Sequence, residues 1–141
     1  MGKIISFGNQ KGGSSKSTCT TLAANNLSQS PFHYRVSVVD VDKQKSLVKA
    51  RLFDGDERTE PYPYDILNYN VPTFEQEAQN LIDQNDFVFV DAAGKLDKDL
   101  PAQHQEISRT LNLIDYLFIP FVAGNYMLES TIEYLQFALE L

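Results

Sequence analysis

The sequence predicts a doubly wound α/β fold, with a mainly parallel sheet and helices on both of its faces. Amphipathic segments alternate with four short, mostly apolar runs, at residues 4–7, 36–41, 87–90 and 116–122. Strands that helices cover on both faces lose the alternation of polar and apolar residues, so such runs are typical of buried parallel strands. Strands that alternate with helices along the chain then predict right-handed crossovers.

The remaining elements follow from the same patterns. A fifth strand is expected at residues 64–69, where a more polar composition suits the edge of a sheet. Five helices are expected, at residues 17–28, 46–53, 74–84, 100–114 and from residue 126 onwards. Thr73 is the expected N-cap of the third helix, because Gln76 follows it at the capping-box spacing. The apolar stripe of the last helix reaches the end of the sequence without a stop signal, which suggests an N-terminal portion of a longer chain.

Length and composition limit the possible classes of protein. The 141 residues suit one domain spanning 1–141, and 43% hydrophobic with 22% charged residues is typical of a globular protein. A net charge of -7 excludes a global positive field for DNA or anionic lipid. Cys19 is the single cysteine, which excludes an internal disulfide and fits a reducing cytoplasm. No apolar stretch approaches the roughly 20 residues that span a bilayer, so no membrane partner is expected.

Chemistry is concentrated in residues 9–18, Asn-Gln-Lys-Gly-Gly-Ser-Ser-Lys-Ser-Thr, between the first strand and the first helix. Glycines let a backbone wrap closely around phosphate with its N–H groups inward, and a helix N-terminus adds partial positive charge. Lys16 would then reach the β and γ phosphates, and the Ser17 hydroxyl would coordinate Mg²⁺. The plain alternative is a glycine-rich turn with solvated lysines.

The strict P-loop pattern fails because Gln10 and Ser15 stand at its two glycine positions. The run instead resembles the deviant P-loop of the ParA family of partition ATPases. In that family an extra lysine, here Lys11, reaches the nucleotide of the partner subunit in an ATP-sandwich dimer. The resemblance implies that ATP is bound by Lys11, Gly12, Gly13, Ser14, Ser15, Lys16, Ser17 and Thr18. Ser15 departs from the family glycine, and a positive φ there would cost roughly 1 kcal/mol or more.

Three aspartates follow strands at positions that match two further family motifs. Asp40-Val41-Asp42 resembles the family's Asp-x-Asp-Pro-Gln segment, which implies that Asp42 activates the attacking water and Asp40 supports the Mg²⁺ shell. Asp91 ends an apolar strand that resembles the Walker B element, which binds Mg²⁺ through water. Taken alone, two aspartates after a strand more often form a helix cap or a solvated turn.

The resemblance implies an ATP-binding and hydrolysing dimerisation switch, with ATP and Mg²⁺ as cofactors and Lys11, Lys16 and Asp42 as catalytic residues. Its implied partners are a second copy of the chain, a ParB-like adaptor, and non-specific DNA bound through a C-terminal part that this sequence lacks. The implied place is the cytoplasm, at the nucleoid. Two alternatives stay open: a catalytically impaired nucleotide-binding or dimerisation module, and a related ATPase with a different cargo. Iron-sulfur carriers of this fold need cluster cysteines, which Cys19 alone does not supply.

Overall fold

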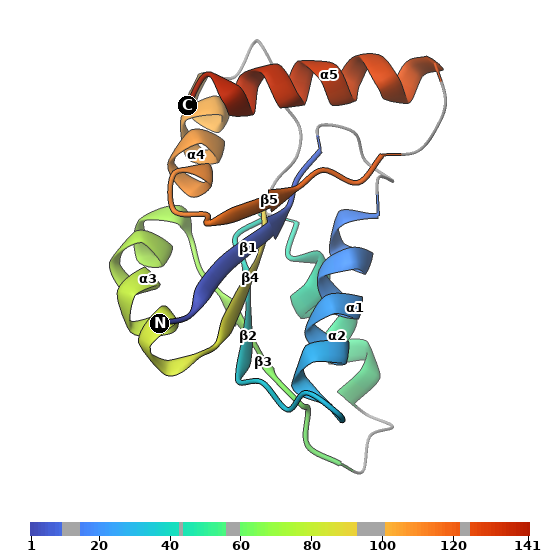
Figure 1. The fold of residues 1–141 in the computed structure, drawn as a ribbon, viewed down its shortest axis with the longest axis vertical. Helices are drawn as coiled ribbons and strands as arrows, with labels where there is room; N and C mark the ends of the chain where they lie inside the picture. The colour runs from blue at the N-terminus through green and yellow to red at the C-terminus, as the bar shows by residue number, and fades with distance from the viewer. Residues whose placement is uncertain (10–14, 43, 56–59, 93–100, 122–124) are drawn as a thin grey trace.

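A computed structural model describes residues 1–9, 15–42, 44–55, 60–92, 101–121 and 125–141. Within these ranges one sheet contains β1 (Lys3–Phe7), β2 (Val36–Asp40), β3 (Asp65–Asn68), β4 (Phe87–Asp91) and β5 (Tyr116–Phe118). The strand order is β3-β2-β4-β1-β5, and each neighbouring pair is parallel (Figure 1). The predicted parallel sheet, the adjacency of β1 and β4 and the edge position of β3 are therefore confirmed.

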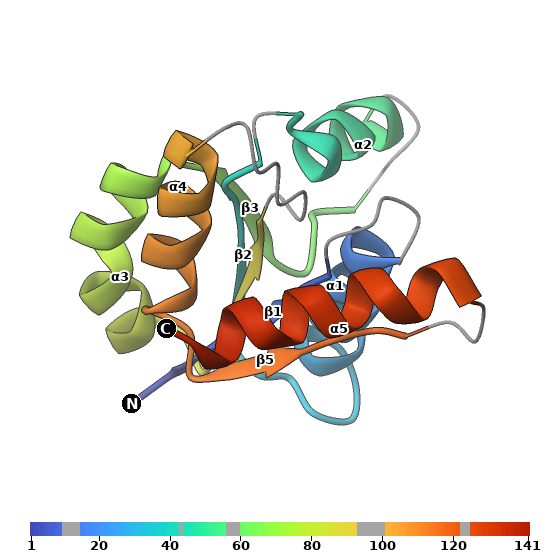
Figure 2. The ribbon, with the colours of Figure 1, turned by 90° about the horizontal axis from the view of Figure 1, so that it is seen from above.

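Helices cover both faces of the sheet, as the sequence predicts. The helices are α1 (Lys16–Ser28), α2 (Ser46–Gly55), α3 (Val71–Gln84), α4 (Pro101–Leu111) and α5 (Asn125–Leu139). In Figure 1, α1 and α2 lie on one side of the sheet, and α3 and α4 lie on the other. Seen from above in Figure 2, α5 crosses the β1 and β5 side of the molecule.

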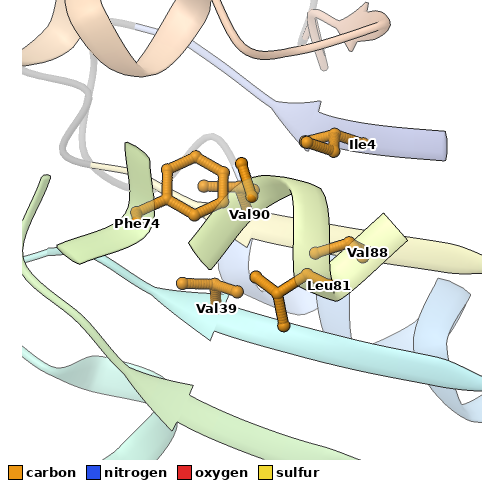
Figure 3. Packing of buried hydrophobic residues seen from close by; sticks show 7 residues of the cluster. Ile4, Val39, Phe74, Leu81, Val88 and Val90 are labelled. Carbon is orange, nitrogen blue, oxygen red and sulfur yellow. The ribbon is translucent and has the colours of Figure 1, made fainter. Parts of the chain in front are cut away.

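Two apolar clusters, one on each face, hold these layers together. Figure 3 shows the α3 cluster, in which Phe74 and Leu81 pack on side chains from three strands, with Ile4, Val39, Val88 and Val90 among its buried members. The second cluster joins α1 and α2 to the opposite face through Ala24, Leu47, Ile5, Val38 and Phe89. Adjacent strand residues such as Val38 and Val39 belong to different clusters, which explains why β1, β2 and β4 are mostly apolar and lack a strict polar–apolar alternation.

The capping of α3 differs from the prediction. Thr73 was the expected N-cap, but α3 begins at Val71 and Asn70 is the N-cap. The Asn70 side-chain oxygen accepts a hydrogen bond from the backbone N–H of Thr73 at 2.8 Å. The prediction was wrong because apolar periodicity marks only the packed turns, and Pro72 in the first turn is the signal that locates the true start.

The end of β5 also differs from the prediction. Parallel pairing with β1 ends at Phe7–Phe118, so β5 stops at Phe118 although the apolar run continues to residue 122. At the same edge of the sheet, Asp40 of β2 lies opposite Asp91 of β4. The carboxyl ends of the central strands therefore bring the candidate acidic residues together, as in other open α/β sheets.

Candidate functional site

The described part of the predicted phosphate-binding loop is its last turn, which leads into α1. Ser15 is the N-cap residue of α1 and has φ 60° and ψ 22°, in the left-handed region. Its side chain makes no capping hydrogen bond, whereas its carbonyl oxygen accepts from Cys19 N at 2.8 Å. The backbone thus adopts the conformation that favours the glycine of the family pattern. Four other predicted ligands, Lys11, Gly12, Gly13 and Ser14, lie outside the described residues.

Ser17 and Asp91 meet directly, although they are far apart in the sequence. The Ser17 hydroxyl, in the first turn of α1, donates to Asp91 Oδ2 at the end of β4, with 2.7 Å between the oxygens. Asp91 is only 2% exposed. A hydroxyl and a carboxylate oxygen at this distance form the kind of hard donor set that suits Mg²⁺.

Burial raises the pKa of Asp91 to about 6 from the ordinary 3.8, against the hydrogen bond that Ser17 donates. The negative charges of Asp40 and Asp42 raise it further, and the positive charge of Lys16 lowers it. Because the unfolded chain releases this proton at lower pH than the folded chain, the folded state loses stability as the pH rises from about 4 to about 6. Asp91 is therefore a destabilising group at neutral pH while no cation accompanies it.

Lys16 lies half-buried at the first position of α1. Burial lowers the pKa of its ammonium group, and the negative charges of Asp91 and Asp42 act in the opposite direction. Three of the predicted site residues, Lys16, Asp42 and Asp91, thus interact electrostatically in one place. This convergence agrees with the arrangement that the sequence predicts for a phosphate and cation site.

Asp40 caps a helix, which is the role that two aspartates after a strand indicate when taken alone. Its fully buried carboxylate accepts from the backbone N–H groups of Leu47 and Val48, at 3.2 and 3.3 Å, in the first turn of α2. It also accepts from Asp42 N at 3.2 Å. These bonds lower its pKa, but burial outweighs them and the pKa of Asp40 is raised. Asp40 therefore fixes the connection from β2 to α2, and its support of a Mg²⁺ shell stays a prediction.

Asp42 lies in that connection, half-buried, and its Oδ1 accepts from Gln44 N at 2.9 Å. This local turn holds the backbone next to the predicted catalytic carboxylate. Lys45, in the same connection, adopts φ 53°, in the left-handed region. Thr18, another predicted ligand, lies exposed on α1.

A cation at this site would need oxygen ligands beyond the acidic side chains. Across the described ranges, no group of three or more His, Cys, Asp or Glu side chains is arranged to hold a metal ion. Mg²⁺ commonly keeps several waters and binds through one or two protein oxygens together with phosphate. The pair of Ser17 and Asp91 fits that requirement.

Two residues at the start of the predicted motif make contacts with α5 that the sequence did not predict. Gly8 and Asn9 join β1 to the loop, and both contact α5. Neither carries a charge that would single it out in the sequence. The available signal is the position of Asn9, a polar residue two positions after the end of β1 and the first residue of the motif at residues 9–18.

Comparison with known proteins assigns the family. A family model described as an AAA domain matches residues 2–91, which include the whole of the described site. The chain belongs to this AAA domain family. It is a ParA-like P-loop family, so the predicted resemblance is confirmed. Among curated proteins, none matches the sequence significantly.

Solved structures from Borrelia burgdorferi share the fold. A plasmid partition protein superposes with a TM-score of 0.76 at 18% identity, over 99% of this chain and 74% of that one. A second protein assigned to plasmid partition, from strain B31 and bound to AMPPNP, gives a TM-score of 0.73 at 18% identity, over 99% and 69% of the two chains. This AAA domain thus has the architecture of P-loop partition proteins. In the part of the chain that the structure describes, no helix is long and apolar enough to cross a membrane.

Proposed function

We propose that residues 1–141 form the nucleotide-binding domain of a ParA-type ATPase, which uses ATP and Mg²⁺ to switch between monomer and dimer. The observation that carries the proposal is the convergence of Lys16, Asp42 and Asp91 beside the start of α1. The strand ends, a helix N-terminus and a lysine there supply the elements that bind phosphate in P-loop proteins. A structural relative that binds AMPPNP supports ATP as the nucleotide.

In the proposed bound state, Lys16 places its ammonium group against the β and γ phosphates. Its charge already offsets the buried Asp91, and the N-terminus of α1 adds partial positive charge. Ser17 and Asp91 would hold Mg²⁺, with Asp91 acting through water. The ion would supply positive charge that offsets the negative charge of the phosphates.

For hydrolysis, we assign to Asp42 the orientation of the attacking water, because its carboxylate lies in the same electrostatic site as Lys16. Lys11 would reach the nucleotide of the second subunit, as the ParA resemblance implies. A ParB-like adaptor would accelerate turnover, and DNA would bind through a C-terminal part beyond this sequence. The ATPase would then act at the nucleoid, in the partitioning of plasmids, chromosomes or mobile elements.

Two substitutions in the full chain separate binding from turnover. Lys16→Ala should abolish Mg-ATP binding, because the lysine meets charge that is present in the bound ground state. Asp42→Ala should leave binding intact and stop hydrolysis, because the aspartate acts on the water. Exposed residues provide charge-matched controls, Lys49→Ala on α2 and Asp83→Ala on α3.

Calorimetric titration with Mg-ATP and phosphate release measure the two properties. Equal affinity for the parent chain and Lys16→Ala would refute the phosphate site. Equal hydrolysis by the parent chain and Asp42→Ala would refute the role in water activation. Light scattering with and without Mg-ATP tests the dimer, and an unchanged mass would remove the switch from the proposal.

A second candidate function is a nucleotide-binding or dimerisation module that has lost catalysis. The left-handed conformation of Ser15, at a glycine position of the family pattern, is the observation that favours it. A chain of this kind would bind Mg-ATP in the titration and release no phosphate, even with the adaptor present. Phosphate release that depends on Asp42 excludes it.

A further inference from the structure

Helix α5 contacts the chain where β1 leads into the phosphate-binding loop. Asn9 is fully buried, and its Nδ2 donates to the carbonyl oxygen of Pro120 at 2.8 Å and to Thr131 Oγ1 at 3.0 Å. Pro120 follows β5, and Thr131 lies on α5. In Figures 1 and 2, α5 crosses the molecule on the side of β1 and β5.

The hydrogen bonds fix the orientation of the Asn9 amide. A carbonyl oxygen can only accept, so the NH₂ group must face Pro120, and its second hydrogen then points to Thr131. Both donors are thereby used, and one side chain links the β5–α5 connection and α5 to the residue before the loop. Neither aspartate nor an apolar residue can make this link.

Stability alone does not account for Asn9. Its Oδ1 is buried and has no hydrogen-bond partner among the described residues. A buried acceptor without a partner is costly, and this cost offsets part of what the two hydrogen bonds of Nδ2 contribute to stability. The amide is therefore better explained by what it positions than by what it contributes to the free energy of unfolding.

Gly8 shows how closely α5 packs against the chain that follows β1. Its N–H donates to the Phe118 carbonyl at 2.9 Å, and a Cβ added there would lie 2.4 Å from Tyr134 Oη and 2.8 Å from Leu117 Cδ1. Tyr134, on α5, is only 2% exposed. The two residues that follow β1, Gly8 and Asn9, are thus held by α5 and by the chain at the end of β5.

We infer that Asn9 is a positioning residue for the phosphate-binding loop, and that through it α5 controls the placement of the loop. The expected effect of this link on nucleotide affinity rests on the proposed function, whereas its expected effect on the order of the loop does not. A change in α5 that breaks the link to Asn9 loosens the loop and weakens phosphate binding.

The test changes α5 and leaves the loop sequence intact. Thr131→Val keeps the shape of the side chain and removes the acceptor, whereas Thr131→Ser keeps the hydroxyl. Amide hydrogen exchange without nucleotide is measured on peptides covering residues 8–17, with residues 36–40 of β2 as the internal reference. We expect Thr131→Val to exchange about fivefold faster in residues 8–17, the factor that one neutral hydrogen bond is worth, and Thr131→Ser to behave as the parent chain.

Mg-ATP titration supplies the second readout, with about fivefold weaker binding expected for Thr131→Val and recovery in Thr131→Ser. Equal exchange of residues 8–17 in the two variants overturns the inference, as does an equal increase in residues 36–40, which would indicate global destabilisation. If exchange changes locally while the parent chain does not bind Mg-ATP, the proposed function fails and the link between α5 and the loop stands.

Discussion

Replacing Ser15 with glycine should stabilise the folded chain. Ser15 has φ 60° and ψ 22°, and its side chain makes no capping hydrogen bond that the substitution would remove. Left-handed backbone costs an L-residue about 1–2 kcal/mol, and glycine adopts it without that cost. The larger freedom of glycine in the unfolded chain opposes the gain by about 0.4–1 kcal/mol. Relief of strain is the larger effect, so we expect a net gain of about 0.5–1 kcal/mol.

Urea unfolding of the nucleotide-free chain measures this gain. Ser15→Ala is the matched control, because alanine keeps the Cβ and removes only the hydroxyl. It should leave the free energy of unfolding close to that of the parent chain. If Ser15→Gly is no more stable than Ser15→Ala, the backbone at this position is not strained and the reasoning fails.

Nucleotide affinity separates strain from crowding at the same residue. Strain that is present with and without nucleotide cancels from the dissociation constant, whereas contact between the Cβ and phosphate exists only in the complex. Mg-ATP binding should therefore tighten about fivefold or more in Ser15→Gly if the Cβ crowds the phosphate, and Ser15→Ala should not share the gain. Equal affinities would show that the loop tolerates serine.

Three other features of the structure are tested by substitution. In metal-free buffer, Asp91→Asn should raise the free energy of unfolding at pH 7 by up to about 3 kcal/mol, and the gain should vanish near pH 4, where the acid is protonated in both states. A gain of equal size at both pH values would contradict the raised pKa. Gly8→Ala should cost about 1–3 kcal/mol in thermal unfolding, because its Cβ would overlap Tyr134. Asn70→Ala should cost about 1 kcal/mol, whereas Thr73→Ala, at the cap first expected from the sequence, should cost far less.

The pattern of β1, β2 and β4 was predictable because each of these strands contributes to both apolar clusters. Val88 and Val90 pack under α3, while Phe89 between them packs toward α1 and α2. Burial on both faces favours apolar residues at successive positions, and this pattern is visible in the sequence. The end of β5 was not predictable in this way, because its length depends on where β1 stops pairing with it.

The acidic residues of the site were predictable from strand ends, but their individual environments were not. Asp40 and Asp42 are two residues apart in one motif, yet one is fully buried and the other is half-buried. The difference arises from α2, whose first turn lies over Asp40 and supplies backbone donors to it. The contacts of Asn9 were missed for a related reason, because its partners on α5 and after β5 are more than a hundred residues away in the sequence.

Asp40 and Asp91 occupy paired positions on neighbouring strands, but the protein satisfies them differently. Asp40 accepts three backbone hydrogen bonds, which use most of the capacity of a carboxylate and tie it to α2. Among the described residues, the Asp91 carboxylate accepts one hydrogen bond, from Ser17, a residue that is itself a predicted cation ligand. A cation that replaced the Ser17 proton as the partner of Asp91 would relieve the cost of burying that charge, whereas one that recruited Asp40 would have to disturb the start of α2. We therefore expect Asp91, rather than Asp40, to be the acidic group that accompanies Mg²⁺, whereas Asp40 accepts a hydrogen bond from Asp42 N and holds that residue in place.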